Sequence, residues 1–203
     1  MDNRCSKCEN KFPYSLKELR ELELRFIDRI WGYRESGDYT DLVWHYGNDP
    51  HSAMDPSVRV LEVLWKEIPE NQKYEIVFAI FTNLKSPASQ MEYFVRDMRK
   101  YRPNTINGWL RNKVDQNGYI TVFRGTGKKE ANPELSLSWT LDKEIAAFFA
   151  SKYWLTKTQT DTFYIYRGQI HIDDVIHYTN CRNESAIAQY GSVKNIQEEC
   201  FPV

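Results

Sequence analysis

The sequence predicts an α+β protein in which a helical N-terminal region precedes a compact part built from strands and short helices. In the first half, apolar residues recur at three- and four-residue spacing between Tyr14 and Arg34, as on one face of an amphipathic helix. In the second half, runs such as Tyr119–Gly125 are rich in residues that favour β-strands. We therefore expect a helical region over residues 1–115 and an α+β core over residues 116–203.

Four helices are expected in the first half. Ser15 precedes the first of them, and Glu18 three residues later completes a capping-box pattern. Pro56 suits the first turn of the second helix, and Pro103 closes the helical region. Gly, Asn, Asp and Pro residues between positions 38 and 56 favour an irregular loop. The predicted helices cover residues 14–34, 56–66, 74–84 and 88–101.

The second half combines strands with one helix. The helix is expected over residues 141–154, with Thr140 as its N-cap and Asp142 in its first turn, where a carboxylate is favourable. Asp173-Asp174 favours a turn between two strands. The predicted strands cover residues 119–125, 162–172, 175–178 and 185–190.

Composition narrows the class of protein. Hydrophobic residues make up 41% and charged residues 27% of the chain, which is typical of a folded globular protein. The net charge of −1 gives no overall attraction to nucleic acid or to a membrane. No apolar run approaches the roughly 18 residues that a membrane span needs, and residues 1–12 lack the apolar segment of a signal peptide. We therefore expect a cytoplasmic protein with reduced thiols and no membrane partner.

Cys5 and Cys8 have the spacing of one half of a zinc site. A tetrahedral site needs two further ligands, usually a second close pair, whereas Cys181 and Cys200 are separated by nineteen positions. We therefore expect free thiols and no metal site, unless the fold brings the two regions together. His171 and His177 fall on predicted strands, where we expect structural roles.

Three short motifs in the second half carry the functional interpretation. A predicted strand ends in Arg124-Gly125, a polar step follows at Ser136–Thr140, and Arg182–Ile187 leads into a late strand. An arginine offers a rigid fork of donors that suits a phosphate or a ribose. A glycine beside it allows the backbone to approach a ligand closely.

The ordered set resembles the Arg, Ser-x-Thr, Glu signature of the ADP-ribosyltransferase superfamily, over about residues 119–191. The resemblance implies a split β core and NAD⁺ as co-substrate. It also implies that aromatic side chains line the nicotinamide pocket, although plain core packing would equally account for Phe149. The NAD⁺-binding residues implied are Arg124, Gly125, Thr126, Ser138, Trp139, Thr140 and Phe149.

The same resemblance leaves two alternatives for the catalytic carboxylate. In the family, the second Glu of Glu-x-Glu stabilises the oxocarbenium-like state as the nicotinamide–ribose bond breaks, and the first Glu orients or deprotonates the acceptor. Here Glu184 matches the first Glu and Ala186 the second. Either Ala186 replaces a lost catalytic glutamate, which the flanking residues favour, or Glu184 is itself catalytic and the register is shifted by two.

The resemblance implies a mono-ADP-ribosyltransferase that modifies a macromolecule, RNA or protein, as a bacterial or phage toxin or defence effector. With Ala186 in place of the glutamate, the alternatives are a catalytically dead NAD⁺- or ADP-ribose-binding module and an interaction protein whose helical half docks an antitoxin. Between Lys85 and Lys113 there are seven basic and two acidic residues, interleaved with aromatic ones. This stretch suits a single-stranded nucleic acid, or is a solvated helix face with its aromatic rings turned inward.

Overall fold

The chain divides into two compact units, Met1–Gln90 and Met91–Val203, which we describe separately. The computed structural model describes residues 16–39, 42, 56–83, 91–154, 161–180 and 184–202. The division falls before the boundary predicted at residue 115. Ile106 and Leu110 explain the difference, because both belong to the core of the sheet in the second unit.

Three helices form the described part of the first unit: α1 (Leu16–Ser36), α2 (Pro56–Leu64) and α3 (Glu70–Asn83). All three were predicted, although α3 begins four residues earlier than expected, at Glu70. A bidentate pair between Arg34 and Glu67, with both oxygen–nitrogen distances at 2.7 Å, links the end of α1 to the turn after α2. Ser15 and most of the loop predicted between residues 38 and 56 lie outside the described residues.

In the second unit, the helix predicted over residues 88–101 is divided into α4 (Glu92–Asp97) and the 3-10 helix η3 (Met98–Tyr101). A further helix, α5 (Thr105–Leu110), was not predicted, because its Asn-Gly step favours a turn. It forms because Ile106 and Leu110, four residues apart on one face, are fully buried. The 3-10 helix η4 (Arg111–Lys113) follows it directly. None of the described helices is long and apolar enough to cross a membrane.

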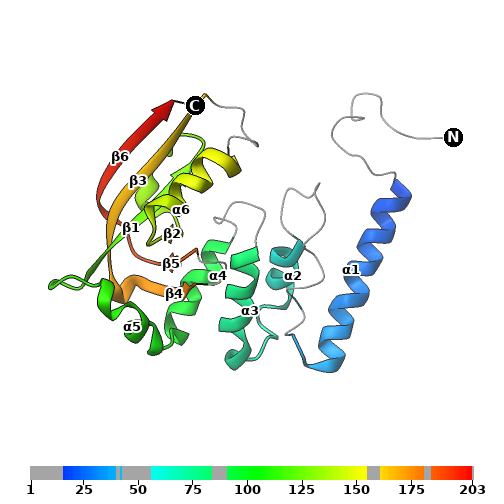
Figure 1. The fold of residues 1–203 in the computed structure, drawn as a ribbon. Coiled ribbons are helices and arrows are strands. Elements are labelled where there is room, and N and C mark those ends of the chain that lie inside the picture. Colours follow the sequence, from blue (N-terminus) through cyan, green and yellow to red (C-terminus); the bar gives the residue numbers. More distant parts are fainter. Residues whose placement is uncertain are drawn as a thin grey trace. The chain divides into compact units, whose positions relative to one another are not determined.

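Six strands form one antiparallel sheet in the order β4-β5-β2-β1-β3-β6 (Figure 1). Four of them match predicted strands, and β2 carries the Ser-Trp-Thr step. The edge strand β6 was missed, because its polar and charged sequence has no clear alternation of apolar residues. The strands are β1 (Tyr119–Thr126), β2 (Ser138–Thr140), β3 (Thr162–His171), β4 (Val175–Thr179), β5 (Ala186–Gln189) and β6 (Lys194–Pro202).

The sheet is narrowest where β1 meets β2. These strands pair at one position, Phe123 with Thr140, whereas β1 and β3 pair over the whole length of β1. The sheet therefore consists of two halves, β4-β5-β2 and β1-β3-β6, joined at a short step. Its strands together with the helices confirm the α+β class.

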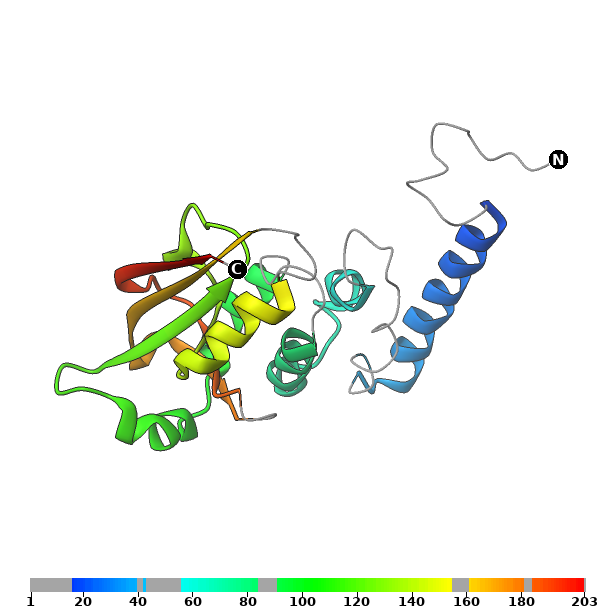
Figure 2. The same ribbon diagram turned by 45° about the horizontal axis from the view of Figure 1, so that its top comes forward.

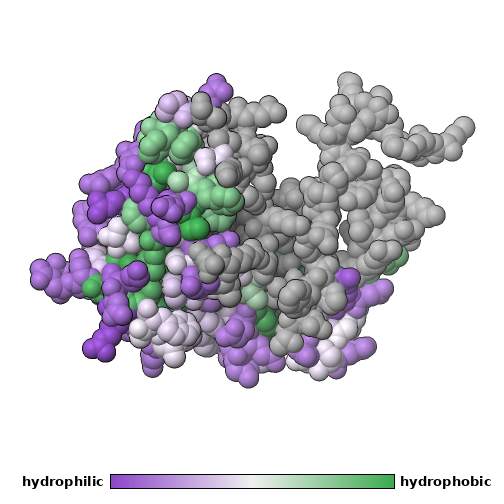
Figure 3. Space-filling view, in the orientation of Figure 1, coloured by the Kyte–Doolittle hydropathy of each residue, from purple (hydrophilic) through white to green (hydrophobic). Residues whose placement is uncertain are grey.

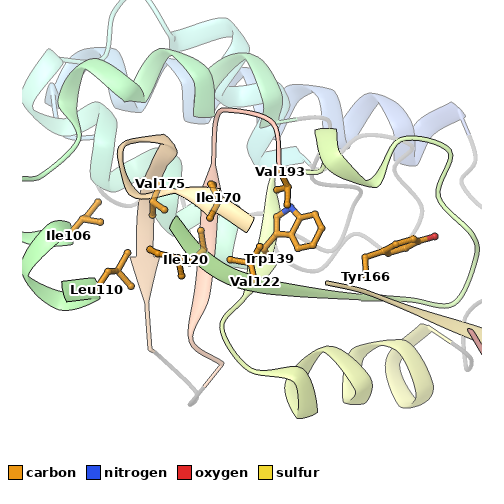
Figure 4. Packing of buried hydrophobic residues seen from close by; sticks show 10 residues of the cluster. Ile106, Leu110, Ile120, Val122, Trp139, Tyr166, Ile170, Val175 and Val193 are labelled. Atoms are coloured by element: carbon orange, nitrogen blue, oxygen red, sulfur yellow. The ribbon is translucent and has the colours of Figure 1, made fainter. Parts of the chain in front are cut away.

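The two faces of the sheet carry different side chains, because successive residues of a strand point to opposite sides. Val122, Trp139 and Ile187 share one face and belong to the hydrophobic core. Figure 4 shows this cluster, with Ile106 and Leu110 beside Val175 and Ile120. The core comprises Ile106, Leu110, Ile120, Val122, Trp139, Tyr166, Ile170, Val175, Ile187 and Val193.

The opposite face of β1 is covered by α6 (Lys143–Phe148), which continues as the π-helical segment Phe149–Trp154 (Figure 2). The prediction that Thr140 caps this helix is wrong. Thr140 belongs to β2, and Asp142 is the N-cap, since its carboxylate accepts hydrogen bonds from the backbone N–H groups of Glu144 and Ile145. Thr140 instead holds the N-cap residue in place, since its hydroxyl accepts a hydrogen bond from the backbone N–H of Asp142 at 3.1 Å.

Candidate functional site

The three sequence motifs lie on neighbouring strands. Arg124 is on β1, Ser138 and Thr140 are on β2, and Ala186 begins β5, in the sheet order β5-β2-β1. In the register of the sheet, Thr140 pairs with Phe123 on one side and with Ala186 on the other. Segments that are far apart in the sequence therefore meet at the narrow step between the two halves of the sheet.

Arg124 joins the two halves of the sheet. Its Nη1 donates a hydrogen bond to the carbonyl oxygen of Ser138 at 2.9 Å. The rest of its guanidinium binds the carboxylate of Glu130 in a bidentate pair, at 2.9 Å from Nε and 2.6 Å from Nη2. Because both side chains are about three-quarters buried, this pair is a stronger link than a surface ion pair.

Glu130 is a residue of this site that no sequence pattern indicates. It lies in the loop between β1 and β2, where a single acidic residue matches no motif. Its carboxylate also accepts a hydrogen bond from the Ser136 hydroxyl at 3.0 Å, and its backbone N–H donates to the Tyr166 hydroxyl at 2.8 Å. Burial raises the pKa of that Tyr166 hydroxyl. Glu130 thus connects the loop between β1 and β2 to the side chain of Arg124.

Thr140 anchors the segment that leads into β5. Its hydroxyl donates to the carbonyl oxygen of Glu184 at 2.6 Å, and the N–H of Leu141 donates to the carbonyl of Ser185 at 3.1 Å. Ser185 has a positive φ of 44°, so the backbone turns between Glu184 and Ala186. Glu184 therefore precedes the strand, whereas Ala186 is its first residue.

Ala186 lies between two threonines. It pairs with Thr140 of β2 and with Thr179 of β4, and directly paired residues project from the same face of a sheet. Both hydroxyl-bearing side chains therefore flank position 186 on the face opposite the hydrophobic core. Ala186 itself is only partly buried.

The remaining predicted site residues have structural contacts of their own. Gly125 lies against the backbone of α6. Thr126 is buried and its hydroxyl donates to the Lys128 carbonyl at 2.6 Å. Trp139 is 2% exposed within the core, and its indole N–H donates to the Ser136 carbonyl at 2.7 Å. Phe149, in the π-helical segment, is half-buried, and its ring contacts the more exposed Phe148 ring.

His177 shares the face of Ala186. It lies on β4 opposite Ala188, two residues from Thr179, so the face around position 186 carries a histidine as well as hydroxyl groups. Burial lowers the pKa of its imidazole to about 4. The ring is therefore neutral at pH 7.

This shift predicts an acid-sensitive fold. The unfolded chain has a histidine pKa of about 6.5, so it binds the proton more tightly than the folded chain does. The free energy of unfolding is therefore unaffected by this histidine above about pH 6.5. It decreases by up to about 3 kcal/mol as the pH falls towards 4, because the unfolded chain takes up the proton first. Urea unfolding at pH 7 and pH 4.5 should show a smaller loss of stability in His177→Gln than in the wild type. As a control, His171→Gln, on β3, should lose as much stability between pH 7 and pH 4.5 as the wild type does. If His177→Gln loses as much as the wild type, the acid sensitivity does not come from His177.

An open groove of about 500 Å³ lies elsewhere, between α6 and the strands β3 and β6. Its floor is apolar, and Figure 3 shows hydrophobic residues gathered there, near the beginning of β3 and the end of β6. Lys143 and Glu199 form an ion pair at its rim, at 2.7 Å. None of the site residues predicted from the sequence lines this groove. Its lining residues are Lys143, Glu144, Ala147, Phe163, Ile165, Glu199 and Phe201.

The part of the chain that the structure describes contains no group of three or more His, Cys, Asp or Glu residues arranged to hold a metal ion. Cys200 is an exposed free thiol on β6. Cys5, Cys8 and Cys181 lie outside the described residues.

No protein-family model matches the chain, and comparisons with curated proteins and with solved structures find no significant match.

Proposed function

We propose that the unit Met91–Val203 binds NAD⁺ as a mono-ADP-ribosyltransferase core in which Ala186 occupies the position of the catalytic glutamate. One observation carries the proposal: Arg124, the Ser138-x-Thr140 segment and Ala186 lie on the neighbouring strands β1, β2 and β5. The position of β5 beside β2 does not follow from chain order, because β3 and β4 lie between them in the sequence. The narrow join between β1 and β2 also fits the split sheet that the resemblance implies.

The register supports Ala186, rather than Glu184, as the catalytic position. In the family, hydroxyl groups of the Ser-x-Thr strand brace the catalytic carboxylate. Thr140 is directly opposite Ala186 in the sheet, whereas Glu184 lies before the strand and meets Thr140 through its backbone carbonyl. Glu184 then corresponds to the first carboxylate, which acts on the acceptor.

The proposed reaction exchanges one bond at the ribose. The bond between the nicotinamide nitrogen and ribose C1′ breaks, and neutral nicotinamide leaves. A nucleophilic atom of a macromolecular acceptor bonds to C1′ and loses its proton. A carboxylate at position 186 would stabilise the positive charge that builds on the sugar. Because an alanine methyl group cannot do so, the chain as written is an NAD⁺-binding protein with little turnover.

NAD⁺ binding is tested by thermal unfolding. A ligand that binds the folded state alone stabilises it by about 1.4 kcal/mol at ten times its Kd, which corresponds to a Tm increase of roughly 3–6 °C for a chain of this size. We expect this increase with NAD⁺ and a loss of most of it in Arg124→Gln, because Arg124 holds β1, β2 and the Glu130 loop together.

Arg167→Gln is the matched control, since Arg167 is an exposed arginine on β3 whose side chain contacts Gln197. It should keep the full NAD⁺ response. A wild-type Tm that does not move with saturating NAD⁺ would overturn the proposal in both its active and its inactive form.

A further inference from the structure

Within the basic stretch between Lys85 and Lys113, the positive charges are concentrated in its second half. Residues 98–114 contain five basic residues, at positions 99, 100, 102, 111 and 113, and no acidic residue. Three of these five have partners. Arg99 lies over the Tyr190 ring, Lys100 pairs with Asp97 at 3.1 Å, and Arg102 donates to the Ile172 carbonyl at 3.0 Å. These three side chains are therefore already engaged in holding the fold.

The other two, Arg111 and Lys113, are different. Both lie in η4, both are exposed, and neither forms an ion pair among the described residues. The nearest acidic residue in sequence, Asp115, uses its carboxylate to accept backbone N–H bonds from Asn117 and Tyr119. Arg111 and Lys113 therefore present side chains that are exposed and not held in an ion pair among the described residues.

An exposed aromatic ring accompanies this charge. Trp109, on α5, is 60% exposed, although a tryptophan is among the most favourable residues to bury. Its ring lies 6.4 Å from the ring of Tyr178 on β4, at an interplanar angle of 49°. Of the two alternatives for this stretch, inward-turned aromatic rings describe the buried Phe94 but not Trp109 or Tyr93, which is 66% exposed.

This surface lies close to the candidate catalytic position. Tyr178 pairs with Ile187 and projects from the core face, whereas the next residue, Thr179, pairs with Ala186 on the opposite face of the sheet. Adjacent strands are about 4.8 Å apart. Because β4 is an edge strand, a chain that stacks on Trp109 must pass around this edge of the sheet to reach position 186.

We propose that Trp109, Tyr178, Arg111 and Lys113 form an acceptor surface that binds single-stranded nucleic acid. Basic side chains that are not held in ion pairs suit phosphates, and an exposed indole suits an unpaired base. The lack of acidic residues over positions 98–114 disfavours a basic protein acceptor. This inference rests on the proposed function, because it names the substrate class of the same site.

The test measures binding of fluorescein-labelled oligonucleotides of about 12 residues to the full chain, a length within the usual range for single-strand sites. Oligouridylate, oligodeoxythymidylate and an RNA duplex are compared. Stacking on one ring contributes enough that Trp109→Ala should weaken single-strand binding by at least about fivefold. Trp109→Tyr, which retains an aromatic ring, should recover most of the affinity.

A second variant tests the charges. Each phosphate contact to a single strand contributes about 0.7 to the slope of log K against log salt, so Arg111→Gln with Lys113→Gln should reduce the slope by about 1.4. Lys66→Gln with Lys128→Gln removes the same formal charge from exposed positions elsewhere and should leave the slope unchanged.

The outcomes separate the two proposals. The acceptor surface is supported if Trp109→Ala binds oligouridylate or oligodeoxythymidylate more weakly than the wild type does and still shows the NAD⁺-dependent Tm increase. Equal affinities of wild type and Trp109→Ala, or a preference for the duplex, overturn it and leave NAD⁺ binding standing. Oligonucleotide binding without any NAD⁺ response overturns the proposed function and with it the acceptor role. If Ala186→Glu transfers labelled ADP-ribose only to protein, the nucleic-acid assignment is wrong while the enzyme class survives.

Discussion

Replacing Ala186 by glutamate is expected to raise NAD⁺ cleavage by on the order of 10²–10³-fold, the usual effect of one well-placed charge-stabilising group. The new carboxylate would begin β5, between Thr140 and Thr179 on the face opposite the core. Because Ala186 is only partly buried and projects from the face opposite the core, the larger side chain does not enter the core. Release of nicotinamide from NAD⁺, followed by chromatography, measures the gain.

Two further variants identify which property of the side chain matters. Ala186→Gln has nearly the same shape as the glutamate variant but no charge, so it should remain as slow as the wild type. Adding Glu184→Gln to Ala186→Glu should retain NAD⁺ cleavage and reduce transfer to an acceptor, if Glu184 is the first carboxylate. A wild-type chain that cleaves NAD⁺ rapidly, and loses that activity in Glu184→Ala, would show instead that Glu184 is the catalytic residue.

Elements whose pattern is local were predictable from the sequence. The strand β1 follows from a run of β-forming residues, and α1 follows from a long apolar stripe. The helix α5 and the strand β6 are different, since neither has a local pattern that outweighs its turn-forming or charged residues. Ile106 and Leu110 make α5 a helix by packing into a core that also includes Ile187 and Val193, from the far end of the chain. Tertiary packing therefore overrides local propensity in α5, whereas β6 is a strand because it pairs with β3 along the edge of the sheet.

The candidate site was predictable in part for the same reason. Arg124, Ser138 and Ala186 could be proposed together because their order along the chain carries a signature. Glu130 could not, because its role depends on a loop that folds back onto Arg124. His177 was expected to be structural, and only the register of β4 against β5 reveals that it shares a face with Ala186.

Gly125 illustrates how one residue type can serve two purposes. The sequence suggests that this glycine lets the backbone approach NAD⁺. The geometry adds a second requirement, because a Cβ atom at position 125 would overlap the backbone carbonyl oxygen of Ala146 in α6. The obstacle is a backbone atom, so no side-chain rotation can relieve it. Any residue other than glycine must push α6 away from β1, beside Arg124.

We therefore expect Gly125→Ala to destabilise the unit Met91–Val203 by about 3 kcal/mol or more, at the upper end of the usual cost of overpacking. Urea unfolding measures this loss. Gly108→Ala is the matched control, because Gly108 lies in α5 and an added methyl group there would meet no atom within 4 Å. Alanine also favours a helix over glycine by up to about 1 kcal/mol, so that variant should be as stable as the wild type or slightly more so. If Gly125→Ala unfolds at the wild-type urea concentration, α6 does not press on β1. The site would then have to be held together by the Arg124–Glu130 contacts alone.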